Sequence, residues 1–177
     1  MTFDYNAIPY GEKDKYVNTV VEISKGSMIK VEWDRTKGYF VLDRVEPAIF
    51  AKPGNYGFIP GTLDDDGDEL DTLIVTDEAL TTGIVIEEAS VIGVMNFEDD
   101  GEMDHKIIVV PSDDRHDGNR THFTELGDKW REQIEHHFTH YKDLKKPGTT
   151  KVLGFGGPEE AWAVISECIV RAENEKA

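Results

Sequence analysis

Short runs of alternating apolar and polar residues fill the chain from residue 17 to about residue 110. This period of two is typical of β-strands, and clusters of Gly, Pro and Asp separate the runs. The pattern predicts short strands at residues 17–24, 28–34, 39–45, 70–76, 84–97 and 105–111. Asp100-Gly101 supplies the positive φ of a tight turn, so residues 97–106 are predicted to form a hairpin.

Two amphipathic helices are predicted toward the C-terminal end, where apolar residues recur every three or four positions. The first begins near residue 124 and is expected to end at Lys145-Lys146-Pro147-Gly148. Its apolar face consists of Leu126, Trp130, Ile134, Phe138 and Tyr141. The second covers residues 156–176 with Pro158 in its first turn. Its buried stripe consists of Trp162, Ile165 and Ile169.

Strands followed by helices indicate an α+β fold, with a small closed or nearly closed antiparallel sheet and helices packed outside it. A length of 177 residues fits one domain, residues 1–177. The net charge of −17 argues against non-specific binding to nucleic acid or anionic membranes, and it favours multivalent cations. The lone Cys168 forbids an intramolecular disulfide. No signal or membrane segment is recognisable, so a cytoplasmic location is expected.

Residues 64–71 hold six carboxylates in eight positions. At ~5 Å and an effective dielectric of ~20, each like-charged pair repels by about 3 kcal/mol. Either these side chains spread into water or a cation holds them, and Asp66, Asp68 and Asp71 are the candidate ligands of a hard cation such as Mg²⁺. An EF-hand is excluded, because its sixth and twelfth positions would be Glu69 and Val75.

Three further polar groups have both a structural and a functional interpretation. The hairpin acids Glu98, Asp99, Asp100 and Asp104 form either a solvated tip or part of a site. Lys30 and Glu32 lie on the same face of a predicted strand. They could form an ion pair that points to solvent, or they could be part of a binding site. Tyr141 and Lys142 close the first helix, and the structural interpretation there is a buried phenol beside a lysine whose ammonium extends to solvent.

Two apparent metal motifs are weaker. Glu132, His136 and His140 share one flank of the first helix, but that flank lies away from its apolar face and lacks an HExxH pattern, so a surface or interface role is expected. The stretch at residues 111–123 resembles the start of a calcium loop, but a loop that begins at Asp113 has Arg115 at its third position and Thr124 at its twelfth. A polar surface loop is therefore the prediction there.

Many carboxylates with scattered cations suit a polyanionic substrate bound through divalent ions, as phosphoryl transfer requires. The candidate cations are Lys30, Arg44, Lys106 and Lys142. Spacing alone does not show that these segments converge.

The chain resembles the soluble family I inorganic pyrophosphatases over roughly residues 15–172. DGDELD at 66–71 fits the family's three-aspartate signature. In the family's order and spacing come VVEI at 20–23, IKVE at 29–32, LDR at 42–44, NYGFIP at 55–60, GVMNFEDDGEMDHK at 93–106 and HYKDL at 140–144.

The resemblance implies an OB-like five-stranded antiparallel β-barrel with flanking α-helices and Mg²⁺-dependent hydrolysis of pyrophosphate. It also implies a homohexamer, as in the short prokaryotic type. The attacking group would be a hydroxide bridging two Mg²⁺ ions, striking one phosphorus in line without a phosphoenzyme. Roughly three to four ions would bind per site. The rival interpretation is a non-catalytic OB-like module that binds divalent cations.

Residue by residue, the resemblance implies Asp68 as general base and Asp66, Asp71 and Asp104 as ligands of one ion, with Asp71 reaching a second. Asp99 and Asp104 would hold a third ion and Glu32 a fourth, while Glu22 would act through water. The groups that would bind the two phosphates are Lys30, Arg44, Tyr56, Lys106, Tyr141 and Lys142.

Three positions depart from the common pattern. Lys52, one residue before Pro53, replaces a phosphate-side Tyr of many members, and we expect it to face the substrate as well. Asp100 replaces a common Glu, and Glu69 replaces the usual Pro of the signature.

Overall fold

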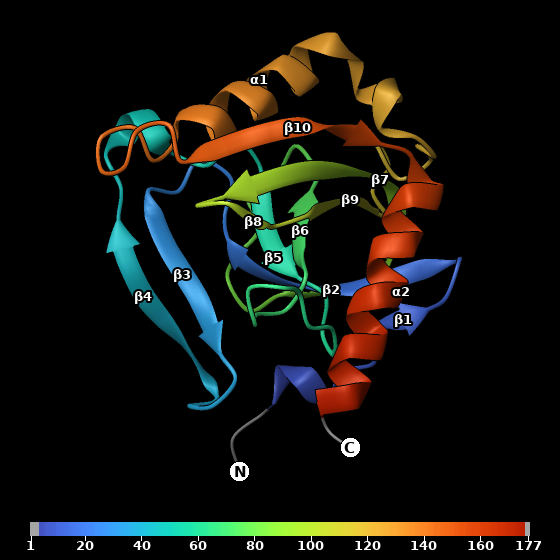
Figure 1. Ribbon diagram of the computed structural model, residues 1–177. Coiled ribbons are helices and arrows are strands. Elements are labelled where there is room, and N and C mark those ends of the chain that lie inside the picture. The colour runs from blue at the N-terminus through green and yellow to red at the C-terminus, as the bar shows by residue number, and fades with distance from the viewer. Residues whose placement is uncertain (1–3, 176–177) are drawn as a thin grey trace.

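The protein is described from a computed structural model, which covers residues 4–175. Five strands close into a ring in the order β2, β5, β6, β9 and β7, because β7 pairs with β2 as well as with β9 (Figure 1). These strands are β2 (Tyr16–Ile23), β5 (Asn55–Phe58), β6 (Asp71–Ile74), β9 (Lys106–Pro111) and β7 (Val85–Asp99). The predicted α+β fold with an OB-like five-stranded barrel is confirmed.

One pairing differs from the antiparallel barrel that we expected. β6 and β9 run parallel, with Asp71 opposite Lys106, while the other ring pairings are antiparallel. The chain can join them in parallel because β7 and β8 (Glu102–Met103) lie between them in sequence and carry it back across the barrel. Asp100 and Gly101 adopt φ of 51° and 91° at the predicted hairpin between β7 and β8.

The remaining strands extend the barrel or stand beside it. β1 (Gly11–Glu12) pairs with β2, and β10 (Thr150–Gly156) pairs with β7. β3 (Ile29–Asp34) and β4 (Tyr39–Val45) form a separate two-stranded sheet that stands beside the ring (Figure 1). Three short 3₁₀ turns, η1 (Tyr5–Ala7), η2 (Ala48–Phe50) and η3 (Phe123–Leu126), complete the described chain.

The two predicted helices lie against different parts of the barrel, α1 (Gly127–His140) across the top of Figure 1 and α2 (Pro158–Glu175) along one side. Ile134 and Phe138 of α1 are buried against strands β6, β7 and β9. Ile165 and Cys168 of α2 join a second core cluster with strands β2, β6, β7 and β9. Both apolar stripes are therefore confirmed. No helix in residues 4–175 has the length and apolar composition needed to cross a bilayer.

Small errors of boundary have local causes. α1 ends at His140 rather than at the predicted residues 145–148, because turns follow it directly. Residue 176 of the predicted second helix lies outside the described residues. Sequence analysis missed β5 and β10, since Gly57 interrupts one alternation and Gly154 the other, where the pairing of β10 with β7 also shifts register.

Candidate active site

A cavity of about 180 Å³ opens between the barrel, the β3–β4 hairpin and the end of α1. Every residue to which the family resemblance assigned a site role lines this cavity, whereas the hairpin acids Glu98 and Asp100 do not. β2, β3 and β4 contribute Glu22, Lys30, Glu32 and Arg44. The loop before β6, the barrel strands and the chain after α1 contribute Tyr56, Asp66, Asp68, Asp71, Asp99, Asp104, Lys106, Tyr141 and Lys142. The tertiary structure thus brings together segments whose convergence spacing could not show.

The acidic loop before β6 presents Asp66 and Asp68 at the mouth of the cavity. Gly67 between them has φ of 91°, a conformation that favours glycine. The backbone N–H of Asp68 donates to Oδ1 of Asp66 at 3.0 Å, and the N–H of Asp64 donates to the carbonyl of Asp68 at 2.8 Å. These bonds fold the loop on itself, and the carboxylates of Asp66 and Asp68 remain exposed at the cavity.

Neighbouring elements hold this loop in place. Arg35, just after β3, donates from Nη2 to the carbonyl of Gly67 at 3.1 Å and forms an ion pair with buried Glu69 at 3.2 Å. Asn6 also donates to Glu69, at 2.7 Å. On the other side, Arg171 of α2 pairs with Asp65 at 2.7 Å. Asp65 and Glu69 are therefore held by arginines, although Glu69 also lines the cavity. Asp66, Asp68 and Asp71 line it as the candidate ligands.

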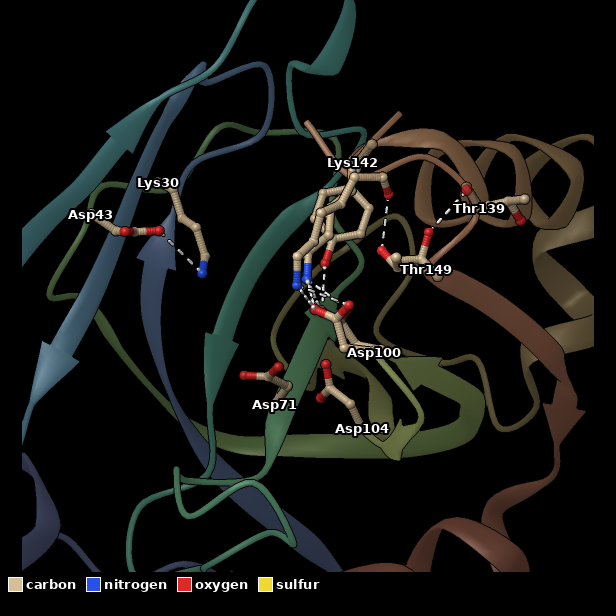
Figure 2. A network of polar contacts seen from close by, with 12 residues as sticks. Lys30, Asp43, Asp71, Asp100, Asp104, Thr139, Lys142 and Thr149 are labelled. Carbon is tan, nitrogen blue, oxygen red and sulfur yellow. Dashed lines mark hydrogen bonds and ion pairs between the residues drawn. The ribbon is translucent and has the colours of Figure 1, made fainter. Parts of the chain in front are cut away.

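Lys106 on β9 is the central cation of the site. Its ammonium donates to both Asp71 and Asp104, and the Tyr56 hydroxyl also donates to Asp71. Figure 2 shows the two aspartates side by side. Burial lowers the pKa of Lys106, but Asp71 and Asp104 outweigh it and raise the pKa overall. For Asp71 and Asp104 the effects are reversed: burial raises the pKa of each carboxyl group, and the charge of Lys106 lowers it by less.

The phosphate-side candidates are also held by carboxylates. Tyr141 donates to Asp99 at 3.1 Å, and Lys142 forms an ion pair with the same carboxylate. At the hairpin tip, Asp100 pairs with Lys142 and Lys146 (Figure 2).

Across the cavity, Lys30 contacts Glu32 on its own strand and Asp43 of β4 at 3.4 Å (Figure 2). Arg44 contacts Asp43 and Glu46. The ion pair predicted for Lys30 and Glu32 is present, and it points into the cavity rather than only to solvent.

Besides Asp71 and Asp104, two more carboxyl groups of the cavity have a raised pKa. Burial and the neighbouring Asp71 raise the pKa of Glu22 well above its ordinary value, although the N–H of Trp33 donates to it at 2.6 Å. Partial burial, then Asp66 and Glu69, raise the pKa of Asp68. A carboxylate with a raised pKa is a stronger base, which suits proton transfer near neutral pH.

The residues of the cavity have the donor chemistry for divalent cations. Eight carboxyl groups and five cationic side chains line it, and hard ions prefer oxygen ligands. In residues 4–175, no three acidic, His or Cys side chains are grouped closely enough to enclose an ion. Asp71 and Asp104 instead share Lys106, and Asp99 is held by Lys142. These carboxylates fit divalent ions, which would replace the lysine ammonium groups as their counter-ions.

The side chains of the two weaker metal motifs have ordinary polar partners in the structure. His136 and His140 are exposed, their ring centroids are 4.7 Å apart, and His140 pairs with Asp143 at 2.8 Å. Glu132 pairs with Lys129 at 2.7 Å. In the loop that resembles a calcium site, Asp114 accepts the N–H of His116 at 2.8 Å, as in an ordinary polar turn.

Some cavity residues had no role in the sequence analysis. Trp33 lines the cavity and orients Glu22 through its backbone. Glu69 is buried and fixes the acidic loop through Arg35, so its replacement of a Pro is compensated by an ion pair. An alternating strand pattern marks Trp33 only as an inward residue, and nothing in the sequence pairs Glu69 with Arg35, which is 34 positions away.

Comparison with known proteins supports one family. A family profile described as inorganic pyrophosphatase matches residues 19–173. The inorganic pyrophosphatase of Neisseria meningitidis serogroup B is 57% identical over 171 residues, covering 95% of this chain and 96% of that protein. That of Haemophilus influenzae is 58% identical over 156 residues, covering 88% of each.

The structural comparison agrees. The crystal structure of an inorganic pyrophosphatase from Neisseria gonorrhoeae matches with a TM-score of 0.93 and 57% identity, covering 96% of this chain and 99% of that one. A family profile spanning most of the chain, relatives above half identity and a shared fold lead to the same conclusion: the chain belongs to the inorganic pyrophosphatase family.

Proposed function

We propose that this protein hydrolyses pyrophosphate to two orthophosphates in the cavity described above. The observation that carries the proposal is the composition of that cavity, where eight carboxyl groups and five cations line one small space. Such a site can bind a highly charged anion only if divalent cations are bound with it. Membership of the inorganic pyrophosphatase family supports the same activity.

The cationic and phenolic side chains bind the two phosphates in this proposal. Lys30 and Arg44 reach the cavity from the β3–β4 hairpin, while Tyr141 and Lys142 reach it from the end of α1. Tyr56 of β5 and Lys106 of β9 lie on the two strands that flank β6, and Asp71 of β6 accepts from both. Groups on opposite walls can hold both ends of a pyrophosphate and direct one phosphorus toward the attacking water.

Asp68 acts as the general base. Its carboxylate lies at the mouth of the cavity beside Asp66, where water has access, and its pKa is raised by partial burial and by neighbouring carboxylates. It takes the proton of the attacking water while the bond to the departing phosphate breaks in line. The departing phosphate keeps the bridging oxygen. The cationic side chains that line the cavity stabilise the negative charge of this phosphate. No covalent bond to the protein forms.

We assign the metal role to Glu32, Asp66, Asp71, Asp99 and Asp104, with Glu22 acting through water. The proposed ion is Mg²⁺, with roughly three to four ions per site. When bound, these ions would neutralise phosphate charge and lower the pKa of the attacking water. Asp71 and Asp104 would then exchange Lys106 for an ion, which frees that ammonium for phosphate.

Hydrolysis should require Mg²⁺ and should fail with Ca²⁺, which should also inhibit competitively. The larger Ca²⁺ tolerates looser geometry and more ligands, so it holds the attacking water less well oriented and less acidic. Phosphate release from pyrophosphate, measured with each ion and with both together, tests this. Equal rates with Ca²⁺ and Mg²⁺ would contradict the metal role assigned to the carboxylates.

We also propose a cytoplasmic homohexamer whose contacts come partly from α1. Large apolar side chains are exposed on the described surface, including Ile29, Leu42 and Val45 of the β3–β4 hairpin and Ile49. Exposed apolar surface of this kind is common at interfaces between subunits. Light scattering at micromolar concentration should give the mass of six chains. A stable monomer would refute the assembly, without affecting the assignment of the cavity.

A further inference from the structure

Lys52 is the one cavity lysine to which the proposed mechanism gives no task. It lies between η2 and β5, and its backbone is fixed by two hydrogen bonds. Its N–H donates to the carbonyl of Ser27 at 3.0 Å, and its own carbonyl accepts from Gly26 at 2.8 Å. Its side chain is only 8% exposed and lines the cavity. The side chain therefore reaches the cavity while remaining largely shielded from solvent.

In the described part of the chain no carboxylate lies within ion-pair distance of the Lys52 ammonium, although the charge of Glu46 partly offsets the fall in its pKa. Among the described residues, Lys30, Lys106 and Lys142 each form an ion pair with an aspartate or glutamate. Lys52 forms none there, and its Nζ lies 5.6 Å and 5.1 Å from the ring centroids of Tyr56 and Tyr141. Two aromatic faces replace only part of the lost hydration, so the buried charge destabilises the folded protein.

The surroundings of Lys52 are those of an anion site. Burial, followed by the charges of Lys30 and Lys106, lowers the pKa of Lys52 to about 8. Nearby His137 adds no charge, because burial lowers its pKa to about 3. A buried ammonium beside other cations is electrostatically unfavourable until an anion binds and neutralises the charge. Unfavourable groups of this kind are common at binding sites.

We propose that Lys52 is a further substrate-binding residue, whose ammonium donates to a non-bridging oxygen of a phosphate group. The inference rests on the proposed function for the identity of the substrate, but its contact is with phosphate as such. It follows that orthophosphate, the product, should bind through the same contact. It also follows that Lys52 contributes to binding at the expense of stability.

Lys52→Met tests both consequences, because Met keeps most of the length and removes the charge. In the presence of Mg²⁺, the KM for pyrophosphate and the Kd for orthophosphate should each rise roughly 10- to 100-fold, as for a lost hydrogen bond to a charged group. The value of kcat should change less. The melting temperature should rise, because the unpaired buried charge is gone. Lys52→Arg, which keeps the charge, should retain most of the affinity.

The matched control is Lys151→Met, the same substitution at an exposed position of β10. It should leave KM, Kd and melting temperature unchanged. A lower melting temperature of Lys52→Met with unchanged KM and Kd would overturn the inference and make Lys52 structural. Failure of the unaltered protein to hydrolyse pyrophosphate would sink the proposed function instead. Calorimetric titration with orthophosphate would still decide the role of Lys52.

Discussion

Asp68→Asn is expected to lower kcat by roughly 10²–10⁴-fold while metal and substrate binding survive. Asn has nearly the shape of Asp but cannot accept a proton from water. The loop should keep its fold, because the bonds that shape it use the backbone groups of Asp68 rather than its carboxylate. Asp66, Asp71 and Asp104 remain as proposed ligands, so the loss should fall on the chemical step.

Asp71→Asn provides the contrast, because Asp71 is proposed to be shared between two ions and also accepts from Tyr56 and Lys106. This variant should mainly weaken the apparent affinity for Mg²⁺. Steady-state rates across pH and Mg²⁺ concentration separate the two effects. The base assignment is wrong if Asp68→Asn keeps a near-normal kcat, or if excess Mg²⁺ restores its activity.

Lys106→Met is expected to lower the free energy of unfolding by about 3–5 kcal/mol when divalent ions are chelated. Lys106 is 2% exposed and donates to two carboxylates, so its loss leaves both without a counter-ion in a largely buried space. If Asp71 and Asp104 bind Mg²⁺ as proposed, the ion should replace the missing ammonium. Added Mg²⁺ should therefore restore much of the stability without restoring activity.

Thermal unfolding in a chelator and in Mg²⁺ measures both parts of this prediction. Lys129→Met is the matched control, since Lys129 is a fully exposed partner of Glu132 on α1 and its loss should leave the melting temperature unchanged. Adding Asp71→Asn to Lys106→Met should recover part of the loss, because one unpaired charge disappears. Two results would contradict the prediction. One is a Lys106→Met protein that is as stable as the parent in the chelator. The other is a rise in melting temperature on adding Mg²⁺ that is no larger for Lys106→Met than for the parent.

Local pattern was enough for most of the elements. The strands β2, β3, β4, β7 and β9 and the apolar stripes of α1 and α2 were predicted from it. β2 and β9 are nevertheless buried at nearly every position, and alternate residues of β9 pack into two different core clusters. It failed at β5 and β10, where Gly57 and Gly154 interrupt the alternation. It also could not give the parallel pairing of β6 with β9, because register across a barrel depends on partners far away in the sequence.

Residue type and spacing were sufficient to predict the fold class, the acidic loop, the hairpin turn and, through the ordered motifs, the family. Those features depend on residues that lie close together in the chain. The pairing of charges could be read only from the folded molecule. The sharing of Asp71 and Asp104 by Lys106, the ion pair between Arg35 and Glu69, and the unpaired ammonium of Lys52 all depend on contacts between separate elements. The strength of a charge interaction is set by distance and burial, and neither is written in local sequence.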